Sequence, residues 1–545
     1  MAEPQPADDP VAASEPKPPK PPKRTTWWPA VALLLASAAT VAWVFVSDAV
    51  DDSFRVPLTI LIGLLDLLLL GLWFLVFAGL RLRTRLLTVG LATLLLAGLG
   101  VIAAMTVRVS GATSGAGIPR LAWKWDVDKP PRSQPTVSHS QPSGELPQIP
   151  VNVSVASPTD FAQFLGPRRD NALDAVQPPL SRDWSTPPKL LWRRPVGAGW
   201  SGFAVVNGFA VTQEQSGGEE RVTCYELATG DLRWSRARPV RFDQAIAGEG
   251  PRSTPTIDGG RVYAFGGTGV LDCLDGATGS VVWSRDVMAD CGGARPLDYG
   301  NSCSPLVTGG LVITTGGVGG PSVLAYRAAD GEPAWRGGAG RTPSYCSPQP
   351  ATLGGKRLVL MIDGAGVTGY LAQTGKVVWE QPWKGGTYNV AQPTVVGDRV
   401  LVTAGYGVGS ALFRVVPGSA DGPLASSQLW ASRGLRAKFN NPTVREGHAY
   451  GLDNNVLVCL DLNDGKRKWR GGEYGYGQVV LVGDLLIVQA EDGRVALVEA
   501  NSEAYRELGV FQGLDSETTS WNPPAMSGRT LLVRNDREAA CFELP

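Results

Sequence analysis

The sequence predicts an all-β fold, an eight-bladed β-propeller, preceded by three transmembrane helices. Two observations carry this prediction: a turn-and-tryptophan repeat in the C-terminal part, and three long apolar runs within the first 107 residues. The composition agrees, because 67 Gly and 42 Pro in 545 residues are too many turn formers for a helical bundle. Lys+Arg and Asp+Glu both number 50, so the chain has no net positive charge with which to hold nucleic acid.

The apolar runs follow a Pro-rich tail over residues 1–26, and they predict a three-helix membrane anchor over residues 27–108. The three runs are Trp28–Val46, Val56–Leu80 and Leu86–Val107. At 1.5 Å of rise per residue, roughly 20 residues cross a hydrocarbon core of about 30 Å. The first run also has an alternative interpretation as a signal peptide, because residues 36–42 are rich in small side chains.

The charges of the short loops orient these helices. The first loop carries Asp51 and Asp52, whereas the second carries Arg81, Arg83 and Arg85. Basic loops stay on the cytoplasmic side of a membrane. We therefore expect a cytoplasmic tail, a multi-pass anchor in a bacterial inner (cytoplasmic) membrane, and a C-terminal part on the periplasmic, extracytoplasmic side.

Asp66 lies near the middle of the second apolar run, and neither of the other two runs holds a Lys or Arg that could pair with it. An acid at this depth is a functional candidate by default. Two interpretations are open. The favoured one is a protonated carboxyl that bonds to a hydroxyl or backbone group of a neighbouring helix, and the other is movement of protons or ions.

Residues 109–159 are rich in Pro, Ser, Gly and Gln and show no apolar period, which is typical of a linker. From residue 160 to residue 545 the sequence changes to short β-branched runs broken by Gly-containing turns. This part is the predicted propeller domain.

A turn that ends in Gly and is followed by a tryptophan recurs along this domain, for example in Leu274–Trp283 (LDGATGSVVW) and Tyr370–Trp379 (YLAQTGKVVW). The repeat tryptophans are Trp192, Trp234, Trp283, Trp335, Trp379, Trp430 and Trp469, and Leu508 ends a copy without Trp. The mean spacing of about 45 residues is that of a four-stranded propeller blade. We expect these tryptophans to pack between blades, a structural role.

The two ends of the domain complete one blade between them. Trp192 has no strands of its own before it, whereas Pro524–Ser527, Thr530–Arg534 and Ala539–Leu544 form three strands that lack a fourth. Pairing the first strand with the last three gives eight blades and a closed ring without a free edge.

The seven cysteines fall into two groups. Cys224, Cys273, Cys459 and Cys541 occupy the small-residue position of the repeat, where Cys packs as a compact hydrophobe. Cys291, Cys303 and Cys346 lie in turns or at strand starts. An oxidising compartment permits a disulfide. Cys291–Cys303 and Cys303–Cys346 are both possible, and we favour the first.

Candidate binding residues lie at the starts of the innermost strands, which line the mouth of a propeller channel. They are Arg252, Asn301, Tyr345, Asn389, Asn440, Asn441, Tyr476 and Trp521. Guanidinium, amide and aromatic groups on one rim could bind a polar ligand or a peptide; the competing interpretation is that they are ordinary polar strand starts. Gly364–Gly369 (GAGVTG) matches a dinucleotide fingerprint by letters only, because no helix follows it, and we predict a hairpin turn there.

The best-kept copy of the repeat, Cys273–Trp283, is similar to the pyrroloquinoline quinone (PQQ) repeat, with Cys in place of its Ala. The segment Asp160–Asn171 (DFAQFLGPRRDN) resembles the lead-in of bacterial PQQ-like repeat proteins. The chain therefore resembles the PQQ-like β-propeller family over about residues 160–545. That family includes quinone-dependent dehydrogenases and also non-catalytic scaffolds such as the outer-membrane barrel-assembly lipoprotein.

The resemblance implies a propeller, and the residues argue against the enzyme. The dehydrogenases of the family place two adjacent cysteines over the cofactor and bind calcium through Glu, Asn and Asp. This sequence has no adjacent cysteines, and the rim candidates include Asn but neither Glu nor Asp. We expect no catalytic residues, no metal and no cofactor, with PQQ and calcium implied only if the chain is a dehydrogenase.

We therefore expect a membrane-anchored, non-catalytic scaffold that binds a protein partner in the cell envelope. One alternative is a PQQ-dependent dehydrogenase that passes electrons to the membrane. A further alternative is a ligand sensor, for which the cytoplasmic tail is too short to hold an output domain.

Overall fold

The computed structural model describes residues 25–47, 50–127, 150–418 and 422–545. Most of the predicted tail and residues 128–149 of the predicted linker lie outside the described residues. The chain divides into two compact units. One unit consists of Met1–Val50 and Phe54–Met105, and the other consists of Asp51–Ser53 and Thr106–Pro545.

Three helices make up the described part of the first unit: α1 (Trp28–Val46), α2 (Asp52–Phe77) and α3 (Leu82–Thr106). Their bounds agree with the predicted apolar runs to within a few residues. Each helix is long and apolar enough to cross a membrane, with a mean hydropathy between 2.1 and 2.7. Most of their large apolar side chains are exposed, as expected of helices whose solvent is lipid.

Polar side chains connect these helices at two places. Ser37 Oγ in α1 donates to Asp66 Oδ1 in α2 at 2.5 Å, which confirms the predicted bond between Asp66 and a hydroxyl of a neighbouring helix. The Arg85 guanidinium donates to the carbonyl oxygens of Leu75 (2.7 Å) and Val76 (3.1 Å). These carbonyls at the end of α2 lack partners within the helix, so Arg85 completes its C-terminus.

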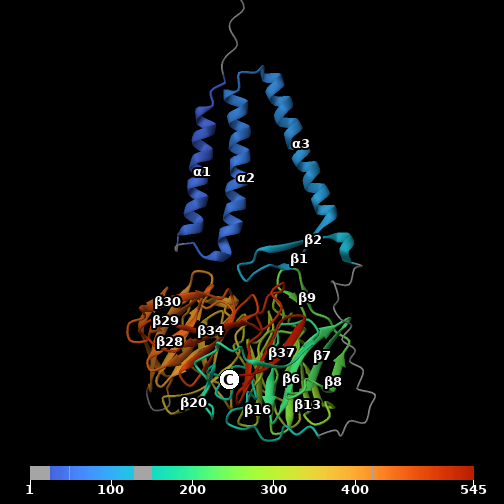
Figure 1. Cartoon of the computed structure of the whole chain (residues 1–545), viewed down its shortest axis with the longest axis vertical. Helices are drawn as coiled ribbons and strands as arrows, with labels where there is room; N and C mark the ends of the chain where they lie inside the picture. Colours follow the sequence, from blue (N-terminus) through green and yellow to red (C-terminus); the bar gives the residue numbers. More distant parts are fainter. Residues whose placement is uncertain (1–24, 48–49, 128–149, 419–421) are drawn as a thin grey trace, which may run out of the picture. The chain divides into compact units, whose positions relative to one another are not determined.

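The second unit is a propeller-type fold built from antiparallel sheets (Figure 1). In the described part of the chain there are seven four-stranded sheets, one five-stranded sheet and two small two-stranded sheets. In most of the larger sheets the strands follow one another in sequence order, because each is joined to the next by a short Gly-containing turn.

The first four larger sheets in sequence order are as follows. They consist of β5 (Ala204–Val206), β6 (Phe209–Ser216), β7 (Glu219–Glu226) and β8 (Leu232–Arg238); β11 (Thr256–Asp258), β12 (Arg261–Phe265), β13 (Val270–Asp275) and β14 (Val281–Asp286); β15 (Leu306–Thr308), β16 (Leu311–Thr315), β17 (Val323–Arg327) and β18 (Pro333–Gly337); and β19 (Gln349–Leu353), β20 (Lys356–Asp363), β21 (Gly366–Leu371) and β22 (Val377–Gln381).

The other four follow. They consist of β23 (Thr394–Val396), β24 (Arg399–Ala404), β25 (Gly409–Val416) and β26 (Ala425–Ser432); β27 (Thr443–Arg445), β28 (His448–Asp453), β29 (Val456–Asp461) and β30 (Arg467–Glu473); β31 (Gln478–Val482), β32 (Leu485–Gln489), β33 (Arg494–Glu499) and β34 (Glu507–Gln512), with β3 (Ala172–Leu173) added beside β31; and β35 (Ala525–Ser527), β36 (Thr530–Arg534) and β37 (Glu538–Glu543), with β4 (Lys189–Pro195) as the fourth strand.

Short elements complete the unit. They are the hairpin β1 (Val107–Ala112) and β2 (Pro119–Trp123), η1 (Lys124–Val127), β9 (Asp243–Gln244), β10 (Gly248–Glu249), α4 (Val287–Asp290) and η2 (Gly386–Tyr388). The hairpin and η1 fall inside the predicted linker, where we expected no structure. The linker's last residues also pack, since Val153 is buried against the sheet that starts at β5. Three Gly residues and a Pro interrupt the short apolar pattern of this hairpin, so the sequence pattern did not predict its strands.

The first strands of consecutive sheets lie side by side, with β35, β5, β11, β15 and β19 in that order and β27 beside β31. The contact of β35 with β5 joins the C-terminal sheet to the first one. In the C-terminal sheet β4 pairs antiparallel with β37, with Trp192 opposite Cys541. A strand from the start of the domain therefore completes a sheet formed by its end.

Each repeat tryptophan lies in the fourth strand of its sheet, opposite a residue of the third strand. The partners are Cys541 for Trp192, Cys224 for Trp234, Cys273 for Trp283, Ala325 for Trp335, Gly369 for Trp379, Leu412 for Trp430 and Cys459 for Trp469. The four repeat cysteines are fully buried at these positions, as their place in the repeat predicts.

Two further sequence predictions have clear outcomes. Gly364 and Ala365 form the turn between β20 and β21, so GAGVTG is a hairpin turn as predicted. The predicted Cys291–Cys303 disulfide is absent, because both cysteines are free thiols. Cys303 Sγ accepts from the Thr315 N–H at 3.4 Å, and a Cβ on Gly316 would lie 3.1 Å from Cys291 Sγ. The two thiols thus share one apolar cluster but are held by different contacts.

Candidate functional site

Strand direction divides the propeller into two faces. The first strand of every sheet begins at one face, here called the mouth face, and the turns between second and third strands return to it. The turns between third and fourth strands, such as Ala228–Gly230, lie at the opposite face, here called the turn face. All eight predicted binding candidates precede a first strand, so they belong to the mouth face or to the inner wall below it.

Three of the four predicted asparagines form amide hydrogen bonds within the protein, and a role of these residues in ligand binding stays a prediction. Asn389 Nδ2 donates to the Ala391 carbonyl at 2.5 Å, and Asn440 exchanges two hydrogen bonds with the backbone of Leu452 (3.0 and 3.1 Å). Asn441 Oδ1 accepts from the Gln392 N–H at 2.8 Å. Asn301 is fully buried, and its amide has no partner among the described residues. The amides of Asn389, Asn440 and Asn441 thus satisfy irregular backbone before the first strands.

Arg252 and Tyr345 are also engaged by the protein. The Arg252 guanidinium donates to the carbonyls of Gly250 (2.6 Å) and Gly248 (2.9 Å) and lies 4.7 Å from the centre of the Phe242 ring. Tyr345 is buried, and its hydroxyl accepts from the Tyr299 N–H at 3.1 Å. Both side chains brace loops of the mouth face.

Tyr476 and Trp521, the last two candidates, meet in one cluster that sequence reasoning identified only in part. We call it the mouth cluster, and its members are Tyr406, Lys438, Phe439, Tyr476, Glu491 and Trp521. Lys438 Nζ lies 4.6 to 5.2 Å from the centres of the Tyr406, Phe439 and Tyr476 rings. Phe439 contacts both Tyr476 (5.9 Å between ring centres) and Trp521 (5.4 Å). Aromatic faces around an ammonium form a cation–π cage.

Glu491 carries the opposite charge of the mouth cluster. Its Oε1 accepts from Trp521 Nε1 at 2.7 Å, and its Oε2 accepts from the Tyr476 N–H at 3.3 Å. Burial raises the pKa of Glu491, and burial lowers the pKa of Lys438 to about 8. In both side chains the charged form is therefore less favourable than it would be on an open surface. A cluster of this kind is suited to binding uncharged polar groups, which can accept from the amine and donate to the carboxylate.

The lead-in segment Asp160–Asn171 occupies the centre of the propeller. Its backbone carbonyls accept from first strands at Val205 (to Phe161, 2.7 Å), Ile257 (to Ala162, 2.8 Å) and Leu481 (to Asn171, 3.0 Å). Its Asp160 carboxylate accepts from Ser527 Oγ of β35 at 2.8 Å. These first strands belong to different sheets and lie far apart in the sequence. A segment of twelve residues can bond to all of them only if it lies at the axis around which the sheets are arranged.

Arg169 is the deepest charge of this segment. It is 1% exposed, and its guanidinium donates to the carbonyls of Ser304 (3.0 Å) and Pro305 (3.1 Å) just before β15. The Arg169 carbonyl accepts from Gln392 Nε2 at 2.5 Å, just before β23. Burial lowers the pKa of Arg169 to about 10. Leu165 and Arg169 have φ near +59° and +54°, a strained backbone that the many contacts hold in place.

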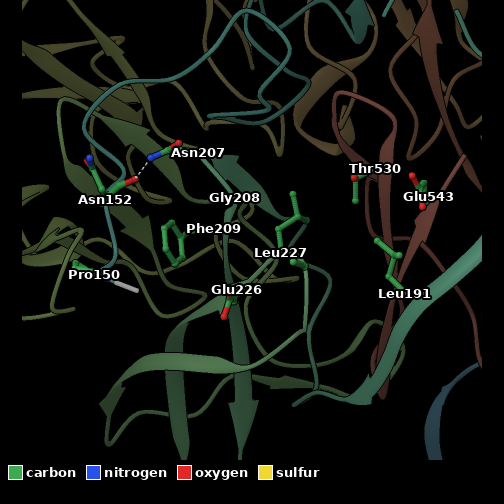
Figure 2. Close-up of a pocket in the computed structure, with 11 residues that line it drawn as sticks. Pro150, Asn152, Leu191, Asn207, Gly208, Phe209, Glu226, Leu227, Thr530 and Glu543 are labelled. Atoms are coloured by element: carbon green, nitrogen blue, oxygen red, sulfur yellow. Dashed lines mark hydrogen bonds between the residues drawn. The ribbon is translucent and has the colours of Figure 1, made fainter. Parts of the chain in front are cut away.

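A cavity of about 650 Å³ lies at the turn face, between the sheets that contain β6 and β36 (Figure 2). Phe209 and Leu227 lie on one side of it, and Leu191, Thr530 and Glu543 lie on the other. Its two carboxylates are already paired, Glu226 with Arg233 (3.5 Å) and Glu543 with Lys189 (3.6 Å). No predicted candidate lines it.

Comparison with known proteins supports the fold and the repeat. Residues 218–471 match the family model described as the outer membrane protein assembly factor BamB. None of the curated protein sequences compared with the chain matches it.

Several solved structures align with this chain at low sequence identity. Quinohemoprotein alcohol dehydrogenase from Comamonas testosteroni is 14% identical, with a TM-score of 0.51 over 71% of this chain and 81% of that one. Quinohemoprotein alcohol dehydrogenase ADHIIG from Pseudomonas putida HK5 is 15% identical, with a TM-score of 0.50 over 73% and 83%. BamB from Moraxella catarrhalis is 17% identical, with a TM-score of 0.48 over 65% and 97%. The resemblance drawn from the sequence is therefore confirmed: residues 218–471 match that family model, and the β-rich unit has the propeller-type fold of the two alcohol dehydrogenases.

Proposed function

We propose that this protein is a membrane-anchored, extracytoplasmic scaffold whose propeller binds a partner protein of the cell envelope and catalyses no reaction. The observation that carries the proposal is the lead-in segment at the propeller axis. Because Arg169 and its neighbours fill the centre, a partner would contact the loops of the mouth face, where Tyr388 is 52% exposed. Such a rim suits a polypeptide better than a small cofactor.

The side chains that could serve as ligands also fit a calcium-bound quinone poorly. Among the described residues, no group of three or more His, Cys, Asp or Glu side chains is placed to hold a metal ion. The sequence has no adjacent cysteines, and the asparagines before the first strands bond to backbone or are buried. The match of residues 218–471 to an assembly-factor family points in the same direction.

Finer features of the architecture belong to this proposal. We infer eight blades in a ring closed by β4, supported by the pairing of β4 with β37 and by the contact of β35 with β5. Electron-microscopy class averages viewed down the propeller axis would count the blades. Seven blades or an open ring would contradict the inference.

Partner binding is tested by photocrosslinking in intact cells. Tyr388 is 52% exposed and precedes the first strand β23, so a photoreactive amino acid there samples the mouth face. Val282 is 39% exposed in the fourth strand β14 and serves as the matched control on the blade edge. We expect one defined protein adduct from position 388 and none from position 282. The absence of an adduct from position 388, or equal adducts from both, would contradict the proposal.

The dehydrogenase alternative has its own test. Purified full-length protein is supplied with PQQ and Ca²⁺, and dye reduction is followed with alcohols or sugars as substrates. We expect no substrate-dependent turnover, and turnover would replace the scaffold with an enzyme.

The orientation of the anchor is tested by reporter fusions. A reporter active only outside the cytoplasm should work after Pro545 and fail after Arg83, because the basic loop between α2 and α3 stays in the cytoplasm. The reverse pattern of activity would overturn the proposed orientation.

A further inference from the structure

The hairpin of β1 and β2 ends in a preformed turn. The Gly117 N–H donates to the Ser114 carbonyl at 3.0 Å, and the Ala116 N–H donates to Ser114 Oγ at 3.1 Å. One step further out, the Thr113 N–H donates to the Ile118 carbonyl at 2.8 Å. The turn therefore keeps its shape through its own bonds and presents Gly115 at its tip.

The mouth cluster holds both main-chain groups of Gly115. The Gly115 N–H donates to Glu491 Oε1 at 2.5 Å, and Lys438 Nζ donates to the Gly115 carbonyl. Hydrogen bonds that involve a charged partner are stronger than those between neutral groups. Glu491 is itself held by Trp521 Nε1 and the Tyr476 N–H, so the acceptor is fixed in position.

Glycine is needed at position 115 because of its surroundings. A Cβ there would lie 2.4 Å from Cγ of Tyr476, which no side chain can tolerate without movement. Gly117 differs, because its φ is +80° and a Cβ on it would meet no atom within 4 Å. One glycine of the turn thus fits the cluster, whereas the other only shapes the turn.

The Lys438 cage explains why a peptide group suits this place. Lys438 is 3% exposed, and three aromatic rings surround its ammonium, stabilising its charge but accepting no conventional hydrogen bond. Nζ donates to Ser53 Oγ at 2.8 Å and has further N–H groups to satisfy. A carbonyl oxygen supplies an acceptor, and the neighbouring N–H supplies a donor to the buried carboxylate. Leaving such buried groups without partners costs about 1 to 3 kcal/mol each.

We propose that the mouth cluster is a binding site for the main chain of a glycine-containing turn, and that the chain's own Ser114–Gly117 turn occupies it. The inference rests on the proposed function, because it names the class of ligand that the scaffold's mouth accepts. The turn acts as an intramolecular ligand that closes the mouth when it is bound. The test of this inference uses purified protein without any partner. The inference about the turn can therefore be disproved even if the protein does bind a partner in cells.

The test measures how fast a cysteine at the turn reacts. Ala116→Cys is introduced into the full-length chain in detergent, where we expect the seven native cysteines to react slowly because all are buried. Position 116 is half-buried, so we expect slow maleimide labelling. Adding Gly115→Val should accelerate labelling at least tenfold, because the new side chain collides with Tyr476. Adding Gly117→Asn instead should leave the rate unchanged, because Asn tolerates a positive φ and meets open space.

A second measurement asks whether the vacated site binds the turn as a ligand. Fluorescent Thr-Ser-Gly-Ala-Gly-Ile, which copies residues 113–118, is titrated into the Gly115→Val protein and its anisotropy is followed. We expect binding of this peptide and no binding of Thr-Ser-Val-Ala-Gly-Ile, with a thermal midpoint within a few degrees of the parent as the folding check.

Three results would overturn the proposal. The first is slow labelling of the Gly115→Val protein, which would mean that the turn does not need a glycine there. The second is fast labelling of the Gly117→Asn protein, which would mean that the turn is held by its own shape alone. The third is equal binding, or equal lack of binding, of the two peptides.

Discussion

At the turn face, successive sheets are joined by copies of one contact, whereas at the mouth face each junction has its own side chains. Trp283 Nε1 donates to the Ala328 carbonyl of the next sheet at 3.0 Å, and a Cβ on Gly331 would lie 2.7 Å from the Trp283 ring. The same pairing recurs for Trp234 with Gly279 and for Trp335 with Gly375.

The mouth face is joined by charges instead. Between the sheets of β7 and β13, Arg238 pairs with Asp272, and the Glu220 carboxylate accepts from the Gly267 N–H at 3.2 Å. Arg252 lies at this same junction, and at the junction that holds Lys438 the pair is Arg436 with Asp453 (2.7 Å). The comparison teaches that the repeat stabilises the sheet junctions from the turn face, which leaves the side chains of the mouth face free to differ.

The largest effect should come from breaking one turn-face junction. Gly331→Ala places a Cβ against the Trp283 ring at a residue with φ near +75°. The left-handed backbone costs roughly 1 to 2 kcal/mol for a non-glycine residue, and the overpacking costs about 1 to 3 kcal/mol more. We expect a loss of about 3 kcal/mol in the free energy of unfolding, measured by denaturant titration of the full chain in detergent.

Gly310→Ala is the matched control for that prediction. Its φ of +78° is nearly the same, but a Cβ there would meet no atom within 4 Å. This substitution should lower the free energy of unfolding only by the cost of the left-handed backbone, about 1 to 2 kcal/mol. Equal losses at the two positions would show that the Trp–Gly contact contributes nothing to the junction.

A smaller and pH-dependent effect should come from the mouth-face junction at Glu220. Burial raises the pKa of Glu220 from 4.5 to about 7, with Arg252, Arg238 and Asp272 as its charged neighbours. The folded state therefore holds the proton more tightly than the unfolded state. The resulting stabilisation is fully present below pH 4.5 and is lost as the pH rises to about 7.

Glu220→Gln should remove this pH dependence. Each pK unit corresponds to about 1.4 kcal/mol, so the wild-type chain should lose roughly 2 to 3 kcal/mol of stability over that range relative to the variant. Unfolding midpoints of both proteins between pH 4 and pH 8 measure the difference. The exposed Glu503→Gln is the control and should follow the wild type. Parallel profiles for all three proteins would contradict the assignment of the effect to Glu220.

The difference between the repeated contacts of the turn face and the irregular contacts of the mouth face also explains which features could be predicted from the sequence. The repeat predicts the fourth-strand tryptophans, the buried small residues opposite them and the strands at both ends, because these contacts recur with one spacing. Lys438 and Glu491 were missed, since their meeting depends on loops of different sheets that share no pattern. The β1–β2 hairpin was missed because Gly and Pro interrupt its short apolar pattern. The prediction of a Cys291–Cys303 disulfide was wrong because closeness in sequence does not determine where two thiols point.

The smallest effect should separate two turn-face junctions that differ in one hydrogen bond. Trp335 Nε1 donates to the Ala372 carbonyl at 3.1 Å, but Trp379 Nε1 is buried without a partner among the described residues. Trp379 faces the sheet that contains β25 and β26, and the connection between these two strands lacks the Gly turn of the repeat. At this junction the Leu424 N–H donates to the Val378 carbonyl. Replacing each tryptophan with Phe removes the same atoms from both junctions. Trp335→Phe should therefore lose about 1 kcal/mol more than Trp379→Phe in the free energy of unfolding, since only the first substitution breaks a hydrogen bond. Equal losses, or a larger loss at Trp379, would show that the indole N–H bonds are not what distinguishes the repeated junctions from the irregular one.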